Sequence, residues 1–380
     1  MKIKGPWLHA AGTQALMAAL LSSGHSAFFV GGCVRNAIIG MAVGDIDIAT
    51  DALPEDVVKI AMAAGFRAIP TGMDHGTVTV IADGILQEVT TLRRDVQTDG
   101  RHAVVAFSTD VAEDAARRDF TMNALYAKAD GSVIDPLNGL PDLIARRVRF
   151  VGQAEARIVE DYLRILRFFR FHAIYGDPTQ GIDAEGLAAC AKNLAGLDTL
   201  SRERVGAEMR KLLSAHDPAL SLAAMEQAGI LARVLPGATS RMVPVLVHFE
   251  DGSPQSWLCR LAVLGGEDVT DTLRLSRAEA ATLAQICAET GTVTAPDALG
   301  WMYGIAVAGD ILHVRAAVFA AALPPQWRGH ALRGVTAVFP VVAADLMPGL
   351  QGPALGKMLK ALQDRWLSSG LCLTKADLLA

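Results

Sequence analysis

Short hydrophobic runs of strand length recur through the first 140 residues. Residues 27–32 (AFFVGG) and 45–50 (DIDIAT) are rich in the apolar, aromatic and β-branched side chains typical of strands. Residues 76–93 contain two more such runs, joined by Asp83 and Gly84, a pair that favours the tight turn of a hairpin. The pattern predicts a small α/β domain built on a mixed sheet.

Helical patterns follow and then take over. Residues 53–65 have Pro54 in the first turn and Gly65 at the end, the usual boundaries of a helix. From about Pro141 nearly to the C-terminus, alanine, leucine and arginine dominate and strand-like runs are few. The predicted fold class is therefore α+β, a mixed-sheet domain with helices followed by an all-helical region.

Composition adds that the chain is globular and excludes several other classes. Its 380 residues are 51% hydrophobic, enough for two or three domains with sizeable cores. We expect no membrane span, because no apolar run approaches the ~20 residues that a bilayer requires. The N-terminal segment resembles a signal peptide, but His9, Thr13 and Gln14 interrupt its apolar run. An amphipathic first helix is the better interpretation.

Cysteine usage indicates the redox compartment, and the net charge limits how the chain could bind nucleic acid. The five cysteines are scattered and form no CxxC pair, which favours a reducing cytoplasm over a disulfide framework or a zinc site. The net charge is −5. Nucleic-acid binding would therefore need a local basic patch, for which residues 143–150 (LIARRVRF) and the Arg117–Arg118 pair are candidates.

Two acidic residues stand on an otherwise apolar strand. Asp45 and Asp47 are two apart and point to the same face, while Ile46 and Ile48 point to the other. Carboxylates that close repel each other unless a cation or a proton lies between them. Hard oxygen ligands on one face suit Mg²⁺, which takes its remaining ligands from water and phosphate. For an isolated pair, two solvated acids on an edge strand are the commoner explanation.

The residues just before the acids favour the metal site. Gly31 and Gly32 follow a strand and precede a probable short helix, so their backbone N–H groups are open to a phosphate. Arg35 lies one turn into that helix and adds a positive charge. Followed so soon by the paired aspartates, this turn becomes a candidate triphosphate-and-metal site.

A second charged cluster lies in residues 159–173 (VEDYLRILRFFRFHA). On a helical wheel, Tyr162, Ile165, Leu166 and Phe169 form a core face, with Phe168 and Phe171 at the edge of the opposite face. That opposite face carries a ridge of four charged residues: Asp161, Arg164, Arg167 and Arg170. A solvated face with a weak Asp–Arg pair is an equally good explanation. Fixed guanidinium and carboxylate groups can, however, present donors and acceptors in the manner of a nucleobase edge.

Taken together, these stretches resemble the class II tRNA nucleotidyltransferase / poly(A) polymerase family, which includes the CCA-adding enzymes. The motifs, in order, are GGCVRN with GDIDIATDALPEDV, RRDFTMNAL, DPLNGLPDLIARRVRF and EDYLRILRFFRF, with a weaker match at SRERVGAEMRKLL. They span about residues 28–213. The resemblance implies a polymerase-beta-like nucleotidyltransferase head over residues 1–140, a helical neck over 141–215 and a helical body and tail over 216–380.

The resemblance also implies roles for individual residues. Asp45 and Asp47 would bind two Mg²⁺ ions, and Glu88 is the candidate third carboxylate, with a paired structural acid as its alternative. The nucleotide-binding residues would be Gly32, Arg35, Arg118, Asp161, Arg164, Arg167 and Arg170. Among these, Asp161 and Arg164 would pair with the base of CTP or ATP. Residues 99–104 (DGRHAV) would lie on the loop that moves between C and A addition.

The chain departs from the family at two places. Asn36 stands where the family usually has Asp, which bears on positioning near Arg35. His216–Asp217 lacks the other ligands of an HD phosphohydrolase site, so we expect no such activity.

The implied activity is template-independent CCA addition to tRNA by a two-metal mechanism. A poly(A) polymerase, an A-adding or CC-adding enzyme, a small-molecule nucleotidyltransferase and a non-catalytic RNA-binding module are the alternatives. The oligomeric state is left open.

Overall fold

The computed structural model describes residues 1–99, 102–250, 256–347 and 349–380. By its internal contacts the chain divides into two compact units. The first comprises Met1–Leu200 with Ala228–Ile230, and the second comprises Ser201–Gln227 with Leu231–Ala380. The finer division into head, neck and body stays a prediction.

A seven-stranded sheet forms the centre of the first unit, in the order β3-β4-β5-β2-β1-β8-β9. Strands β2 and β5 are parallel and the other neighbours are antiparallel, so the predicted mixed sheet is confirmed. The strands are β1 (Ala27–Val30), β2 (Ile46–Thr50), β3 (Arg67–Gly72), β4 (Thr77–Ala82), β5 (Ile85–Thr91), β8 (Tyr126–Ala127) and β9 (Val133–Ile134).

The predicted hairpin is β4 and β5. Its turn residues Asp83 and Gly84 both have positive φ, 49° and 78°, as a two-residue hairpin turn requires. A second hairpin, β6 (Arg93–Asp99) and β7 (His102–Phe107), forms a separate two-stranded sheet. It follows β5 directly along the chain.

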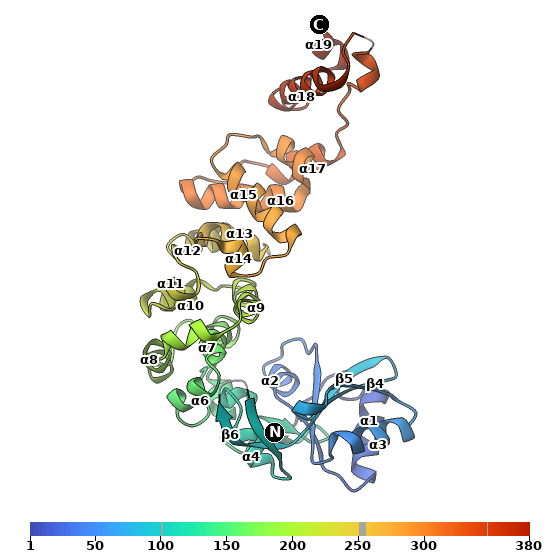
Figure 1. Cartoon of the computed structure of the whole chain (residues 1–380), viewed down its shortest axis with the longest axis vertical. Coiled ribbons are helices and arrows are strands. Elements are labelled where there is room, and N and C mark those ends of the chain that lie inside the picture. The colour runs from blue at the N-terminus through green and yellow to red at the C-terminus, as the bar shows by residue number, and fades with distance from the viewer. Residues whose placement is uncertain (100–101, 251–255, 348) are drawn as a thin grey trace. The chain divides into compact units, whose positions relative to one another are not determined.

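Helices α1 (Ala11–Ser22) and α3 (Pro54–Ala63) cover one face of the large sheet (Figure 1). Leu16, Met17 and Leu20 of α1 are fully buried there, together with Ile48 of β2. This confirms an amphipathic first helix.

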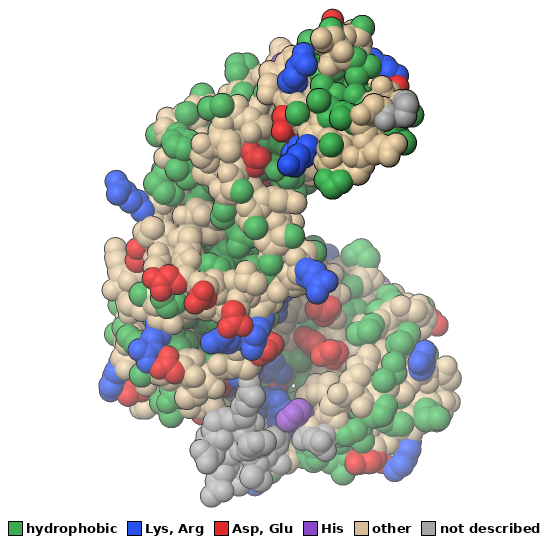
Figure 2. Space-filling model, turned by 45° about the horizontal axis from the view of Figure 1, so that its top comes forward, with side chains coloured by type: hydrophobic (Ala, Val, Ile, Leu, Met, Phe, Trp, Pro, Cys, Tyr) green, Lys and Arg blue, Asp and Glu red, His purple; other side chains and the backbone are tan. Residues whose placement is uncertain are grey.

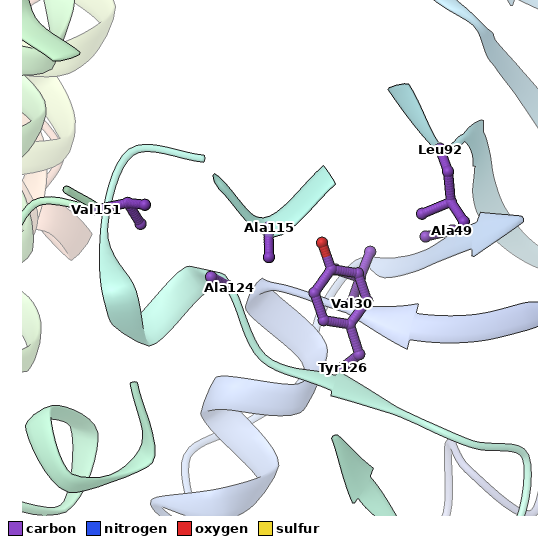
Figure 3. Close-up of a cluster of buried hydrophobic side chains, with 7 residues drawn as sticks. All are labelled: Val30, Ala49, Leu92, Ala115, Ala124, Tyr126 and Val151. Atoms are coloured by element: carbon purple, nitrogen blue, oxygen red, sulfur yellow. The ribbon is translucent and has the colours of Figure 1, made fainter. Parts of the chain in front are cut away.

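The opposite face carries a second hydrophobic cluster next to the predicted acids. Its members are Val30, Ala49, Leu92, Ala115, Ala124, Tyr126 and Val151 (Figure 3). Ala115 comes from α4 (Val111–Ala116), which follows the second hairpin. Because Ala49 is two residues from Asp47 on β2, this cluster and the Asp47 carboxylate lie on the same side of the sheet.

The rest of the first unit is helical: α5 (Leu140–Ile144), α6 (Ala154–Glu160), α7 (Leu163–Tyr175) and α8 (Ala184–Lys192). The ridge segment is not one continuous helix as predicted, because the chain leaves helical geometry at Asp161, with φ −154° and ψ 104°. The side-chain oxygen of Asp161 accepts a hydrogen bond from the Leu163 N–H at 3.1 Å, which helps to start α7.

Two phenylalanines of α7 lie elsewhere than predicted. Phe168 and Phe171, expected at the edge of the charged ridge, are buried against Phe120 and Phe150. The wheel was wrong there because α7 packs against the rest of the unit on more than one side. Ile165, Leu166 and Phe169 are buried as predicted.

From residue 202 onward the described chain is helical, as predicted. The helices are α9 (Arg202–Leu213), α10 (Ala219–Gln227), α11 (Ile230–Val234), α12 (Val243–Glu250), α13 (Trp257–Leu264), α14 (Val269–Thr272), α15 (Arg277–Thr290), α16 (Pro296–Phe319), α17 (Trp327–Thr336), α18 (Gly352–Ser368) and α19 (Lys375–Leu379). In the second unit, α16 packs against α12, α13, α15 and α17. A separate cluster around Trp366 joins α18 and α19 to Trp301 and Phe339.

Helix α16 corrects one expectation. Its 24 residues are long and apolar enough to cross a bilayer, so the expectation that no segment has such a length is wrong. Half of its most apolar window is buried inside the protein, and its buried residues include Asp310 and His313. Its helical geometry also breaks at Gly304. These are properties of a core helix.

Candidate functional site

The paired acids lie at the start of a central strand. Asp45 is exposed on the bend just before β2, and Asp47 is half-buried within β2. Ile46 and Ile48 are buried, as the alternation predicts. Asp47 is the register partner of Glu88 on the parallel strand β5, so the third predicted acid lies directly beside it.

The charges around Asp47 are not balanced. Burial and the neighbouring Glu88 raise the pKa of Asp47 from 3.8 to about 6, and Asp45 acts in the same direction. Arg118 and Arg35 oppose this increase without cancelling it. A bound cation would remove the repulsion, because it favours the ionised form of all three acids.

The donor set fits a hard divalent cation. Carboxylate oxygens are the protein ligands that Mg²⁺ prefers, and Mg²⁺ normally completes its shell with water and phosphate oxygens. Within the described residues, no three His, Cys, Asp or Glu side chains are arranged to hold a metal ion by themselves. Asp45 and Asp47, with Glu88 beside Asp47, supply the type of oxygen donor that Mg²⁺ takes, and water or phosphate would have to provide its remaining ligands.

A glycine turn precedes the acids. Gly31 has φ 68°, a left-handed conformation that favours glycine, and α2 (Gly32–Ile38) begins at the next residue. A Cβ atom at Gly31 would lie 3.4 Å from Nη1 of Arg118. The absent side chain lets the Arg118 guanidinium approach the backbone of the turn.

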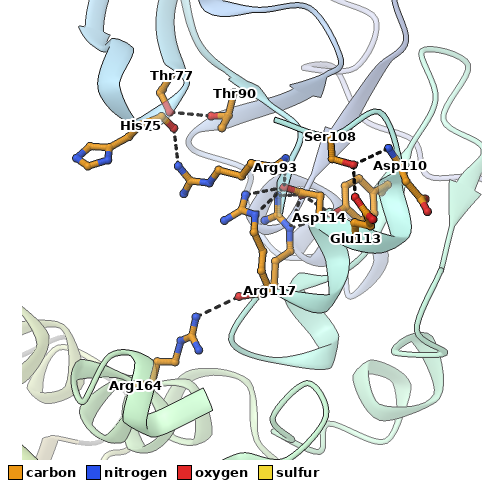
Figure 4. Close-up of polar contacts among 12 residues, drawn as sticks. His75, Thr77, Thr90, Arg93, Ser108, Asp110, Glu113, Asp114, Arg117 and Arg164 are labelled. Atoms are coloured by element: carbon orange, nitrogen blue, oxygen red, sulfur yellow. Dashed lines mark hydrogen bonds and ion pairs between the residues drawn. The ribbon is translucent and has the colours of Figure 1, made fainter. Parts of the chain in front are cut away.

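Arg118 is held by a buried carboxylate, Asp114 of α4. Asp114 is 1% exposed and accepts hydrogen bonds from Arg117 at 2.6 Å, from Arg118 at 2.9 Å and from the Tyr126 hydroxyl at 2.6 Å (Figure 4). Burial alone would raise the pKa of Asp114, but Arg118, Arg117 and the Tyr126 hydroxyl bring it down from 3.8 to about 2. A permanently ionised carboxylate thus fixes Arg117 and Arg118. These arginines begin the RRDFTMNAL stretch, residues 117–125, which is called the RRD segment below.

Arg35 is enclosed by three partners. Its Nε and Nη2 donate to Oδ1 of Asn36 at 3.1 and 2.9 Å, its Nη1 donates to Asn123, and its Nη2 donates to the Tyr175 hydroxyl at 2.6 Å. Its guanidinium also lies 3.9 Å from the centre of the Tyr175 ring. Arg35 is 6% exposed, so most of its donors serve the protein itself.

The Asn36 side chain both accepts and donates hydrogen bonds, whereas an ionised carboxylate can only accept them. Its Oδ1 accepts from Arg35, and its Nδ2 donates to the Ala42 carbonyl at 2.8 Å. The acceptor is therefore retained where the family usually has Asp. The amide also ties Arg35 to the loop that leads into Asp45.

A buried aspartate connects this site to α7. Asp119 accepts from Arg167 Nε at 2.8 Å and from Asn123 at 2.9 Å. Burial would raise the pKa of Asp119, but Arg167 and the hydrogen bonds from Asn123 and the Phe120 N–H lower it below its usual range. The contacts form a continuous chain from Arg167 through Asp119 and Asn123 to Arg35.

The predicted base-reading residues lie at the α6–α7 junction. Arg164 pairs with Glu160 at 2.6 Å and donates to the carbonyls of Arg157 at 2.8 Å and Arg117 at 3.1 Å. Its guanidinium is thus positioned by α6 and by the RRD segment. Arg170, one turn beyond Arg167, lies 4.6 Å from the centre of the Phe171 ring.

Comparison with known proteins decides the family. Residues 27–149 match the model of the Poly A polymerase head domain, and residues 181–242 match the probable RNA and SrmB-binding site of polymerase A. The human mitochondrial CCA tRNA nucleotidyltransferase 1 is 43% identical over 217 residues, covering 56% of this chain and 50% of that protein. The CCA-adding enzyme of Bacillus cytotoxicus is 41% identical over 204 residues, covering 53% of this chain and 49% of that protein.

Residues 27–149 belong to the Poly A polymerase head domain family.

A solved relative extends the likeness over nearly the whole fold. The Bacillus stearothermophilus CCA-adding enzyme, solved with CTP, has a TM-score of 0.80 at 28% identity, covering 97% of this chain and 94% of that one. The Thermotoga maritima enzyme, solved with tRNA, shares the fold at 17% identity and a TM-score of 0.66. The chain spans about half the length of the curated relatives it matches.

The predicted basic patch needs correction, and part of the predicted moving loop lies outside the described residues. Arg117 and Arg118 are mostly buried and paired with Asp114, so they do not form a surface basic patch. Arg146 and Arg147 are exposed, while Figure 2 shows basic and acidic side chains interspersed over the visible face. In the predicted moving loop, residues 100 and 101 and the side chain of His102 lie outside the described residues.

The residues to which the sequence assigned no role share one in the structure, which is holding the arginines. They are Asp114, Asp119, Asn123, Tyr126 and Tyr175. The quoted RRDFTMNAL stretch contained Asp119 and Asn123, but nothing in spacing alone showed that they accept from arginines on other elements. Asp114 carried one usable signal, since an acid three and four residues before two arginines on a helix pairs with both.

We predict that proton and cation compete at Asp47. Because the pKa of Asp47 is raised to about 6, the neutral form that cannot bind metal becomes dominant below that pH. Half-saturating Mg²⁺ should rise about tenfold between about pH 7.5 and about pH 5. Calorimetric titration of the protein with Mg²⁺ measures this. In Asp47→Asn, this pH dependence should disappear together with most of the affinity, and a pH-independent affinity in the unmodified protein would contradict the assignment.

We also predict that Asp114→Asn destabilises the first unit by about 2 kcal/mol at neutral pH, the free energy that corresponds to a carboxyl pKa lowered from 3.8 to about 2. Because the pKa is lowered, this contribution is complete above about pH 4 and is lost as the pH falls through about 2. Urea unfolding at about pH 7 and about pH 3 tests the sign. Glu113→Gln, an exposed change on the same helix, is the control. An equal deficit at both pH values would exclude charge as its source.

Proposed function

We propose that this chain adds CCA to the 3′ ends of tRNA, taking nucleotides from CTP and ATP without a nucleic-acid template. The observation that carries the proposal is the juxtaposition of Asp47 with Glu88 on parallel strands, just after a glycine turn that opens a helix. Such a site can hold both a divalent cation and a triphosphate. The full-length likeness to a CCA-adding enzyme that was solved with CTP supports the choice of substrate.

In the proposed reaction, Asp45 and Asp47 hold two Mg²⁺ ions, with Glu88 as the candidate third carboxylate. When bound, such ions activate the terminal 3′-hydroxyl and neutralise the charge of the departing pyrophosphate. The Gly31–Gly32 turn receives the triphosphate, and Arg118, fixed by Asp114, supplies positive charge beside it. Positioning and charge neutralisation supply the rate, and no covalent intermediate with the protein is needed.

Base selection is proposed for Asp161 and Arg164. The Arg164 guanidinium is fixed by Glu160 and two backbone carbonyls, so its remaining donors have a defined direction. A rigid group of this kind discriminates between bases better than a mobile one, because mismatched hydrogen bonds then stay unpaired. Arg167 and Arg170 complete the nucleotide site on the same helix.

The tRNA is proposed to bind through phosphate contacts, with exposed Arg146 and Arg147 as candidates in the first unit. All five cysteines are free, which suits the reducing cytoplasm where we propose that the protein works. A non-catalytic RNA-binding module would not need Asp47 and Glu88 on adjacent strands with Asp45 just before them. A small-molecule nucleotidyltransferase would not need the α7 ridge.

Asp45→Ala should reduce nucleotide incorporation by more than about a hundredfold, because a metal ligand is lost. The fold should remain intact, since Asp45 is exposed and precedes the strand. Incorporation of labelled CTP into tRNA that lacks CCA measures the effect. The matched control is Asp56→Ala, a partly exposed aspartate on α3 whose side chain pairs with Lys59. Near-normal incorporation by Asp45→Ala would refute the metal site.

Arg164→Ala should change the ratio of CTP to ATP incorporation by about tenfold or more, a change that exceeds its effect on Mg²⁺ dependence. The assay offers mixed labelled CTP and ATP to tRNAs that lack CCA, end in C or end in CC. Product lengths from the unmodified protein also separate full CCA addition from CC-only, A-only and poly(A) synthesis. An unchanged nucleotide ratio in Arg164→Ala would remove this residue from base selection.

A further inference from the structure

Tyr175 is the last residue of α7 and makes two different contacts with Arg35 of α2. Its ring centre lies 3.9 Å from the guanidinium carbon, and its hydroxyl accepts from Nη2 at 2.6 Å. Phe171, one turn earlier on α7, adds a second ring 5.2 Å from the same carbon. Arg35 is therefore held from α7 as well as from its own helix.

These contacts join two parts of the proposed site. Arg35 lies in the first turn of α2, whose first residue is Gly32 of the phosphate-binding turn. Helix α7 carries Arg164 and Arg167, the first of which is proposed to select the base. The sugar links the triphosphate to the base covalently and limits how far apart they can lie, so one nucleotide can reach both the turn and the ridge only if the two are held in register.

We propose that Tyr175 is a positioning residue, which holds Arg35 and through it the Gly31–Gly32 turn in register with the ridge on α7. This inference rests on the proposed nucleotidyl transfer. Tyr175 itself touches neither the acids nor the proposed base-selecting residues in the contacts described. Its effect passes through Arg35, whose other partners Asn36 and Asn123 belong to α2 and to the RRD segment.

The hydroxyl is the specific element of this contact. Tyr175 is buried, so its hydroxyl cannot be replaced freely by water when it is removed. Tyr175→Phe keeps the ring stacked on Arg35 and deletes only the acceptor of the 2.6 Å hydrogen bond. Arg35 then loses one of its fixed directions without a cavity being created.

The test is steady-state kinetics of Tyr175→Phe with CTP and ATP on the matching tRNA ends. We expect KM for both nucleotides to rise about tenfold, the effect of one hydrogen bond to a charged group, with an unchanged CTP to ATP preference. A merely structural tyrosine would lower the unfolding temperature and the active fraction, which reduces kcat, and would leave KM unchanged. That result would overturn the proposal.

Two further variants make the test specific. Tyr303→Phe removes a hydroxyl that hydrogen-bonds to Glu289 at 3.0 Å in the second unit, and its KM should not change. In an Arg35→Lys background, Tyr175→Phe should add little to KM, because the group that it positions is gone. A full tenfold increase in that background would show that Tyr175 does not act through Arg35.

The outcomes also distinguish a failure of the Tyr175 inference from a failure of the proposed function. If the unmodified protein incorporates neither nucleotide, the proposed function fails. If the unmodified protein is active and Tyr175→Phe retains its KM, only the role of Tyr175 fails.

Discussion

The repulsion between neighbouring carboxylates on β2 and β5 is the constraint from which the rest of the site follows. Asp47 and Glu88 are placed side by side by the register of two parallel strands, and Asp45 precedes them on a bend. Holding these acids together costs free energy unless a cation lies among them. The burial of Ile46 and Ile48 in the core on the other face of the sheet offsets this free-energy cost. A cation bound at these acids, as proposed, would remove this cost.

The arginines around this site are held in two different ways. Arg117 and Arg118 are fixed by one buried carboxylate, whereas Arg35 and Arg167 are linked through Asp119 and Asn123. In each case the partner is buried, so the ion pairs are screened less than surface pairs are. The network makes the RRD segment the connection between the sheet and α7. A motif that appears in sequence as a run of binding residues is therefore also a structural joint.

Much of this could be predicted from the sequence, and the limits have physical causes. The alternation around Asp47 fixed which side chains enter the core, and Asp83–Gly84 marked the hairpin, because both signals are local. The break at Asp161 was missed, since the helical spacing continues through it and only the backbone angles reveal it. Phe168 and Phe171 were misplaced because a wheel describes one helix and not the neighbours that surround it. Two of the three hydrogen-bond partners of Arg35, Asn123 and Tyr175, come from segments distant in sequence, which no local pattern specifies.

The extended backbone at Asp161 has a consequence for how such a site diversifies. A side chain on a two-residue joint between helices takes its direction from its own φ and ψ, and not from the rotation of either helix. Arg164, the second residue of α7, keeps its direction through its contacts with α6 and the RRD segment. The acidic and the basic member of the pair can therefore be re-aimed separately, by lengthening, shortening or twisting the joint. If Asp161 and Arg164 select the base as proposed, a change in this joint would alter the nucleotide preference while every helix keeps its packing.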